Sequence, residues 1–188
     1  TLEVNGVRLG GDKISHITFI GLNYYKTFSF FLKRYKKKYS KEIAIKKAVV
    51  KAIDFGILQE KTFTGRSRLI SGLFSFGDME ANYQGLRLFH NICGGDNPYV
   101  IKVKGKWYLR SLVDITPYIT PELDETYYPS AFRKSFWKKV KKNLVNYCNE
   151  SSYKALRARW RYYSTFRKKS FSYYYLQQKI REGKIKDN

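Results

Sequence analysis

The chain has 188 residues and carries 37 Lys and Arg against 15 Asp and Glu, which gives a formal net charge of +22. This length is typical of one domain, and the large positive charge favours an anionic partner such as nucleic acid, an anionic membrane or a cell wall. The sequence holds no run of 18 apolar residues, so we expect no transmembrane helix.

The first part of the chain predicts a short strand followed by two helices. Residues 1–11 indicate a strand or arm that ends at Gly10-Gly11. Apolar residues recur at helical spacing over 12–39 and predict a helix that ends in the basic run at 36–38. Residues 40–60 predict a second helix, whose apolar face consists of Ile43, Ala44, Ala48, Val49, Ala52, Ile53 and Ile57.

The middle of the chain alternates between glycine-rich turns and one further helix. Residues 61–77 are punctuated by glycine and predict a hairpin or a glycine-rich loop. A third helix opens near Asp78 and ends before 94–98, and residues 99–115 predict a second hairpin. The proline-marked acidic stretch 116–130 predicts an irregular loop.

The last part of the chain changes in composition. Residues 131–148 predict a fourth helix, whereas the segment from Ser151 is rich in Arg, Lys and aromatic residues and predicts one or two short helices. We therefore expect a domain over 1–150 with a basic, aromatic extension over 151–188. The fold class predicted is mainly α with one or two small β-hairpins.

Three carboxylates flank the first glycine-rich segment. Glu60 lies at a predicted helix C-terminus, where the helix dipole and partial burial both raise a carboxyl pKa. Asp78 and Glu80 open the next helix, where the dipole favours ionised carboxylates. A protonated acid opposite an ionised one is the arrangement that glycoside hydrolysis requires. The alternatives are that Glu60 is an exposed, ion-paired residue, that Asp78 is an N-cap and that Glu80 is an ordinary first-turn residue.

The order of helix, terminal glutamate, hairpin and further helix resembles the lysozyme-like superfamily, which includes goose-type lysozymes and soluble lytic transglycosylases. The resemblance covers about residues 40–92. It implies an α+β, lysozyme-like fold in which Glu60 is the general acid and either Asp78 or Glu80 is the second carboxylate.

The same resemblance implies a sugar-binding cleft near the glycine-rich segment. Ser71 and Ser75, both within "ISGLFS", match the positions that line this cleft in the superfamily. Tyr83 and Trp107 are further candidates for substrate binding, because aromatic rings stack on sugars and have a polar rim.

A second resemblance joins residues that are far apart in the sequence. The stretch "DKISH" at 12–16, Glu60 and the stretch "DMEANYQG" at 78–85 are similar to VanZ-like proteins, which are membrane proteins of uncertain biochemistry. The matching residues are Asp12, His16, Glu60, Asp78, Asn82 and Gly85. The resemblance implies a shared site, with His16 in it, but names no reaction.

Other chemistries find little support in the sequence. The two His and two Cys lack paired ligand spacing, and no dinucleotide or P-loop fingerprint is present, so we expect no metal and no cofactor. Cys93 and Cys148 permit one disulfide in an oxidising compartment, but two reduced thiols fit equally well. The run "RARWRYYSTFRKK" suits a surface that binds nucleic acid or another anionic polymer.

The function predicted is a peptidoglycan-cleaving glycoside hydrolase that acts as a monomer. We expect it to be exported, either periplasmic or secreted, with its leader removed, and to bind peptidoglycan or another anionic glycan. The alternatives are a non-enzymatic basic module that binds nucleic acid or an anionic polymer, with nucleic acid the less favoured partner, and a VanZ-like protein of unknown reaction.

Overall fold

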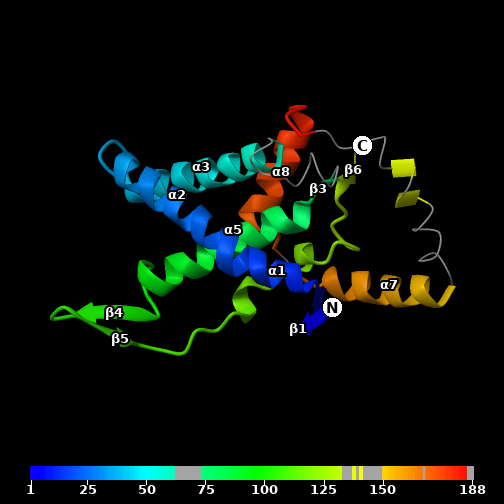
Figure 1. The fold of residues 1–188 in the computed structure, drawn as a ribbon, viewed down its shortest axis with the longest axis horizontal. Helices are drawn as coiled ribbons and strands as arrows, with labels where there is room; N and C mark the ends of the chain where they lie inside the picture. The colour runs from blue at the N-terminus through cyan, green and yellow to red at the C-terminus, as the bar shows by residue number, and fades with distance from the viewer. Residues whose placement is uncertain (62–72, 133–136, 139, 142–149, 167, 186–188) are drawn as a thin grey trace.

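The computed structural model describes residues 1–61, 73–132, 137–138, 140–141, 150–166 and 168–185. Long helices dominate this part of the chain, and its strands form two-stranded antiparallel sheets (Figure 1). The prediction of a mainly α protein with small β-hairpins is therefore confirmed.

The chain begins with a hairpin that the sequence analysis expected only as a single strand or arm. Strands β1 (Leu2–Val4) and β2 (Val7–Leu9) pair antiparallel. Asn5 and Gly6 join them with φ values of 50° and 70°, the left-handed pair that a tight two-residue hairpin turn requires. Val7 and Leu9 are buried, so the hairpin lies on the body of the protein.

A continuous helical run follows the hairpin. It consists of α1 (Gly11–Ser15), a π-helical segment η1 (His16–Ile20) and α2 (Gly21–Tyr35). The residues at each junction keep right-handed helical backbone angles, so the axis is not broken. The π-helical turn shifts the register of the side chains, and such turns occur frequently at functional sites.

Two long helices pack on this run. Helix α3 (Lys41–Lys61) returns alongside α2, and α5 (Phe76–Cys93) crosses it (Figure 1). The crossing depends on Gly21 and Gly85, because a Cβ on Gly85 would lie 2.1 Å from the Ile17 carbonyl oxygen and 2.6 Å from the Gly21 Cα. Most of the predicted apolar face of α3 is buried, namely Ala44, Ala48, Ala52, Ile53 and Ile57.

The segment between α3 and α5 differs from its predicted form. Strand β3 (Leu73–Phe74) pairs with β6 (Ala131–Phe132), far along the chain, rather than with a neighbouring strand. Most of the predicted 61–77 hairpin lies outside the described residues. The prediction of a helix from 131 is wrong at its first residues, which form β6, and most of its remainder lies outside the described residues as well.

The second predicted hairpin is present, and much of the predicted acidic loop is buried. Strands β4 (Val100–Val103) and β5 (Lys106–Leu109) pair across Lys104 and Gly105. The next segment forms the 3₁₀ turns η3 (Thr116–Tyr118) and η4 (Pro121–Leu123), which pack against α5. Burial of Tyr118 and Leu123 holds this irregular segment in place.

The C-terminal segment forms two helices, as predicted. They are α7 (Glu150–Tyr163) and α8 (Phe171–Arg181), and α8 packs on α5. Leu176 of α8 and Ile185 lie in the same hydrophobic cluster as Tyr24 and Met79. The segment expected as an extension after residue 150 therefore contributes to the core.

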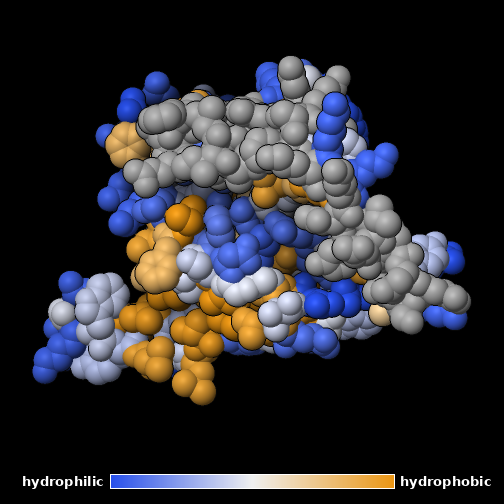
Figure 2. Space-filling model, turned by 45° about the vertical axis from the view of Figure 1, so that its right-hand side comes forward, coloured by the Kyte–Doolittle hydropathy of each residue, from blue (hydrophilic) through white to orange (hydrophobic). Residues whose placement is uncertain are grey.

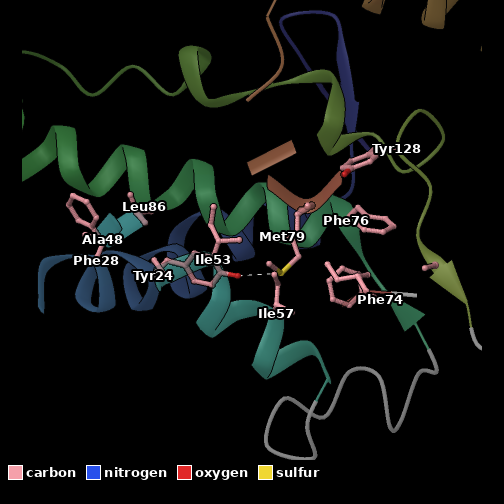
Figure 3. Packing of buried hydrophobic residues seen from close by; sticks show 14 residues of the cluster. Tyr24, Phe28, Ala48, Ile53, Ile57, Phe74, Phe76, Met79, Leu86 and Tyr128 are labelled. Atoms are coloured by element: carbon pink, nitrogen blue, oxygen red, sulfur yellow. Dashed lines mark hydrogen bonds between the residues drawn. The ribbon is translucent and has the colours of Figure 1, made fainter. Parts of the chain in front are cut away.

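Helix α5 lies between two hydrophobic clusters. Met79 and Leu86 belong to the larger cluster, which α2, α3 and α8 share and which Figure 3 shows. Ala81 and Leu88 belong to a second cluster with the N-terminal hairpin, η3, η4 and α7. Helix α5 is covered on both sides. Its polar side chains must therefore either reach solvent near an end of the helix or form hydrogen bonds with partners in the interior.

Candidate functional site

The start of α5 organises the candidate site. Ser75 is the N-cap, and its hydroxyl oxygen accepts a hydrogen bond from the Asp78 backbone N–H at 3.0 Å. The same hydroxyl donates to Glu125 at 2.9 Å. The alternative that Asp78 itself caps the helix is therefore wrong, and the Asp78 carboxylate is available for other contacts.

A buried lysine joins three carboxylates beside this helix end. The Lys13 ammonium, on α1, donates to Asp78 at 2.5 Å, to Asp12 at 2.8 Å and to Glu125 at 2.9 Å. Only 2% of its side chain is exposed. Burial alone would lower the pKa of Lys13, but the charges and hydrogen bonds of Asp78, Asp12 and Glu125 outweigh it and raise the pKa. The lysine therefore stays charged and fixes the orientation of Asp78.

His16 lies one helical turn further along, on the π-helical segment. Its Nδ1 is 3.0 Å from the Asn82 Oδ1, so the two side chains share a hydrogen bond. Its Nε2 is 3.6 Å from the second oxygen of Asp78. About a quarter of the His16 side chain is exposed, so this ring connects a fixed carboxylate with solvent. A partly exposed imidazole held in this way is suited to proton transfer.

Tyr24 connects this cluster with the end of α3. It is fully buried, and its hydroxyl donates to the Met79 sulfur at 3.3 Å (Figure 3). Burial raises the pKa of Tyr24, a hydrogen bond with Asn82 lowers it, and the charges of Glu60 and Asp78 raise it further. Two carboxylates from different helices thus act on one phenol, although they are 18 positions apart.

Gly56 allows the tyrosine to approach α3 so closely. A Cβ at this position would lie 1.5 Å from the Tyr24 hydroxyl oxygen, so a larger residue would displace the ring from the cluster. Glu60 is one turn further along α3, half-buried at its C-terminal end. The glycine therefore sets how closely α3 packs on Tyr24 of α2.

Glu80 has a different environment from Asp78. It is completely buried, and its carboxylate accepts hydrogen bonds from Gln84 at 2.5 Å, Ser170 at 2.7 Å and Thr120 at 3.3 Å. Burial raises the pKa of Glu80, and these hydrogen bonds partly offset the effect. Because the group faces the interior, we do not assign it to the site, and its hydrogen bonds give it a role beyond that of an ordinary first-turn residue.

Two further acids, from the 116–130 loop, lie in the interior. Glu122 is 1% exposed and pairs with Lys169 at 2.6 Å. Asp124 is 4% exposed and accepts from the Tyr163 hydroxyl at 2.9 Å. Their partners come from the C-terminal segment, so the acidic loop is fastened to the helices that follow residue 150.

The structure gathers some of the residues predicted for the site and leaves others elsewhere. Asp78, Ser75 and His16 meet at the start of α5, together with Asp12 and Asn82 of the second resemblance, and Glu60 lies within electrostatic reach through Tyr24. Ser71 lies outside the described residues.

Two predicted aromatic residues lie apart from the cluster. Tyr83 packs against the larger hydrophobic cluster, and burial raises its pKa to about 12. Trp107 is on the β4–β5 hairpin, which follows the far end of α5 (Figure 1). Neither side chain is in the group around Asp78.

Sequence reasoning missed Lys13, Glu125 and Tyr24. Lys13 stands within the quoted "DKISH" stretch, directly beside Asp12, and a lysine among the apolar positions of a predicted helix is a signal of a buried partner. Nothing local marks Glu125 or Tyr24, because their role depends on segments that are distant in the sequence.

The cluster does not resemble a metal centre. Within the described ranges, no group of three or more His, Cys, Asp or Glu is arranged to hold a metal ion. The Lys13 ammonium occupies the position between Asp12, Asp78 and Glu125 that a cation would take. In the same part of the chain, no helix is long and apolar enough to cross a membrane.

Comparison with known proteins identifies no relative from which a role for these residues could be inferred. The sequence matches no protein-family model and no curated protein, and the fold matches no solved structure.

Proposed function

We propose that the protein is a glycoside hydrolase that acts on an anionic glycan, with peptidoglycan as the substrate to test first. The observation that carries the proposal is the Asp78 carboxylate, which Lys13 holds beside the partly exposed His16 ring at the start of α5. Glycoside hydrolysis requires a second carboxylate, and Glu60 at the C-terminal end of α3 is the candidate. The lysozyme-like arrangement and an exported location belong to the same proposal.

The two carboxylates take different roles. Glu60, at the C-terminal end of α3, is the general acid that protonates the leaving oxygen. Asp78 is the ionised carboxylate, because Lys13 binds it directly. His16 and Asn82 keep the second oxygen of Asp78 oriented, and the net charge of +22 concentrates an anionic polymer near the site.

The test is cleavage of purified peptidoglycan by the full chain and by Glu60→Gln. The substitution is nearly isosteric, so a folded variant should lose at least about a hundredfold in rate. Asp78→Asn should lose a comparable factor. The matched control is Glu42→Gln, which changes an exposed glutamate in the first turn of the same helix and should leave the rate unchanged. Full activity in a folded Glu60→Gln protein would refute the proposal.

A second candidate is a module that binds an anionic polymer without cleaving it. The exposed face of α7 favours it, since Tyr153 and Trp160 are both exposed there and Arg157 stacks on Tyr153 at 5.3 Å. Aromatic rings interleaved with cations are typical of surfaces that bind polyanions. Polymer binding that is lost in Arg157→Gln/Arg161→Gln, without any cleavage by the parent protein, would favour this candidate.

A further inference from the structure

The hairpin segment, which we define as residues 100–115, exposes many apolar side chains. Leu112 is 83% exposed, Trp107 is 63% exposed and Leu109 is 61% exposed. Other exposed hydrophobic residues of the hairpin segment are Val103, Tyr108, Val113 and Ile115. Contiguous apolar surface of this kind marks a contact site on a folded protein.

The hairpin segment projects from the body rather than packing on it. It leaves the C-terminal end of α5 and extends away from the helices (Figure 1), and every residue of β5 is exposed. Hydrophobic side chains gather along the lower edge of the molecule beside this projection (Figure 2). A two-stranded hairpin is only marginally stable by itself, so a partner surface would stabilise it.

The strand register gives the hairpin a defined contact face. Lys102 pairs with Trp107 and Val100 with Leu109, so these four side chains share one face. The Lys102 ammonium lies 5.5 Å from the centre of the Trp107 ring. An indole and a leucine beside a long basic side chain allow the apolar groups to enter a lipid surface while the ammonium stays at the headgroups.

The hairpin segment is positively charged, so it favours a negatively charged partner. Its cations are Lys102, Lys104, Lys106 and Arg110, and Asp114 is the acid among its residues. Basic residues close to a membrane surface each add affinity for anionic lipid. A second copy of the chain is a poor occupant, because two molecules of net charge +22 repel each other.

The aliphatic residues distinguish between two anionic partners. Single-stranded nucleic acid is bound by aromatic stacking and cations and gains little from exposed leucine or valine. Burial of Leu109, Leu112 and Val113 in the acyl boundary of a bilayer removes apolar surface from water. We infer that the hairpin segment is a peripheral docking element for an anionic lipid surface.

The test measures binding of the full chain to lipid vesicles by co-sedimentation. The protein should bind phosphatidylcholine vesicles that contain phosphatidylglycerol, and should bind pure phosphatidylcholine vesicles at least about tenfold more weakly. The double variant Leu109→Ser/Leu112→Ser should lower the partition coefficient on the anionic vesicles by at least about tenfold. Both residues are exposed, so the fold should be retained.

The matched control is Phe30→Ser, which removes an exposed apolar side chain from α2. It should leave vesicle binding within about twofold of the parent, because it lies outside the hairpin segment. Unchanged binding by the Leu109/Leu112 variant, or absence of binding by the parent protein, would overturn the inference. Binding to a single-stranded oligonucleotide that depends on the two leucines would assign the surface to nucleic acid instead.

Trp107 provides a second readout that needs no loss of binding. The chain has three tryptophans, so Trp137→Phe/Trp160→Phe leaves Trp107 as the sole indole. Its emission should shift to the blue on anionic vesicles and be quenched by brominated acyl chains, as expected for a ring at the headgroup boundary. Emission that stays unshifted and unquenched on bound vesicles would contradict docking through this face.

Discussion

Two polar clusters lie on opposite sides of the first turns of α5, and they differ in what surrounds them. The site cluster consists of Lys13, His16, Asp78, Asn82 and Glu125, and several of its side chains reach solvent. The interior cluster consists of Glu80, Glu122 and Asp124 with their partners from the C-terminal segment. Residues two positions apart on a helix face opposite ways, so Asp78 and Glu80 enter different clusters.

The difference shows what each cluster can do. In the interior cluster each carboxylate accepts from a hydroxyl, an amide or a lysine, and the partners Tyr163, Lys169 and Ser170 join the C-terminal segment to α5 and the 116–130 loop. In the site cluster one ammonium joins several carboxylates next to a partly exposed imidazole. The first arrangement stabilises the fold, whereas the second presents ionised groups where a substrate can meet them.

Removing Lys13 should have the largest effect on stability. Lys13→Met keeps the length of the side chain but leaves Asp78, Asp12 and Glu125 without their common cation. Loss of one partner of a buried ion pair typically costs 3–5 kcal/mol, and we expect about 3 kcal/mol because Asp12 and Glu125 are partly solvated. Urea unfolding measures the change.

The control for this prediction is Lys41→Met. It breaks the ion pair with Asp96, in which both side chains are mostly exposed, and should leave the free energy of unfolding almost unchanged. The double variant Lys13→Met/Asp78→Asn should recover part of the loss, since it removes the most buried of the unpaired charges. Equal effects of Lys13→Met and Lys41→Met would show that burial does not distinguish the two pairs.

Glu80 should make the free energy of unfolding depend on pH. Burial raises the folded-state pKa of Glu80 above its ordinary value of 4.5, so the folded protein holds this proton more tightly than the unfolded chain. The free energy of unfolding of the wild type should therefore fall relative to that of Glu80→Gln as the pH rises above about 4.5. The fall should be at most about 1.4 kcal/mol per pH unit, and the difference should become constant above the raised pKa.

The amide in Glu80→Gln can still accept from Gln84 and donate to the Ser170 oxygen, so the variant should fold. Unfolding curves measured at several pH values for the two proteins give the difference directly. A difference that does not vary with pH would mean that Glu80 titrates alike in the folded and unfolded states.

The sequence predicted the helices well because their apolar spacing is local. The buried face of α3 and the hairpin turn at Lys104-Gly105 follow from periodicity and turn chemistry. Pairing of Leu73–Phe74 with Ala131–Phe132 could not be predicted, because it joins segments about sixty positions apart. The C-terminal segment was expected to be a basic extension because cations and aromatic residues alternate along it, yet Leu176 is fully buried.

For the candidate site, the sequence indicated which residues take part better than it indicated which residues they contact. The motif around Asp12, His16, Asp78 and Asn82 was visible as a pattern, and these residues do meet. Helix polarity alone treated Asp78 and Glu80 as equivalent first-turn acids. Only the packing of α8 and the 116–130 loop against one side of α5 makes one of them interior.

The smallest expected effect compares the two serine caps, one in each cluster. Ser75 caps α5 and donates to Glu125, while Ser170 caps α8 and donates to Glu80. Ser75→Ala should cost about 1 kcal/mol, the usual value of an N-cap, because water can replace its contact with the partly exposed Glu125.

Ser170→Ala should cost about 2 kcal/mol, since water does not reach the fully buried Glu80 and its carboxylate then loses a donor. Thermal or urea unfolding of the two single variants gives both values. The same substitution in the Glu80→Gln background should lose most of this excess, because a neutral amide depends less on the hydroxyl. If Ser75→Ala proved as costly as Ser170→Ala, the site cluster would be as closed to water as the interior cluster, and a substrate would have no access to Asp78.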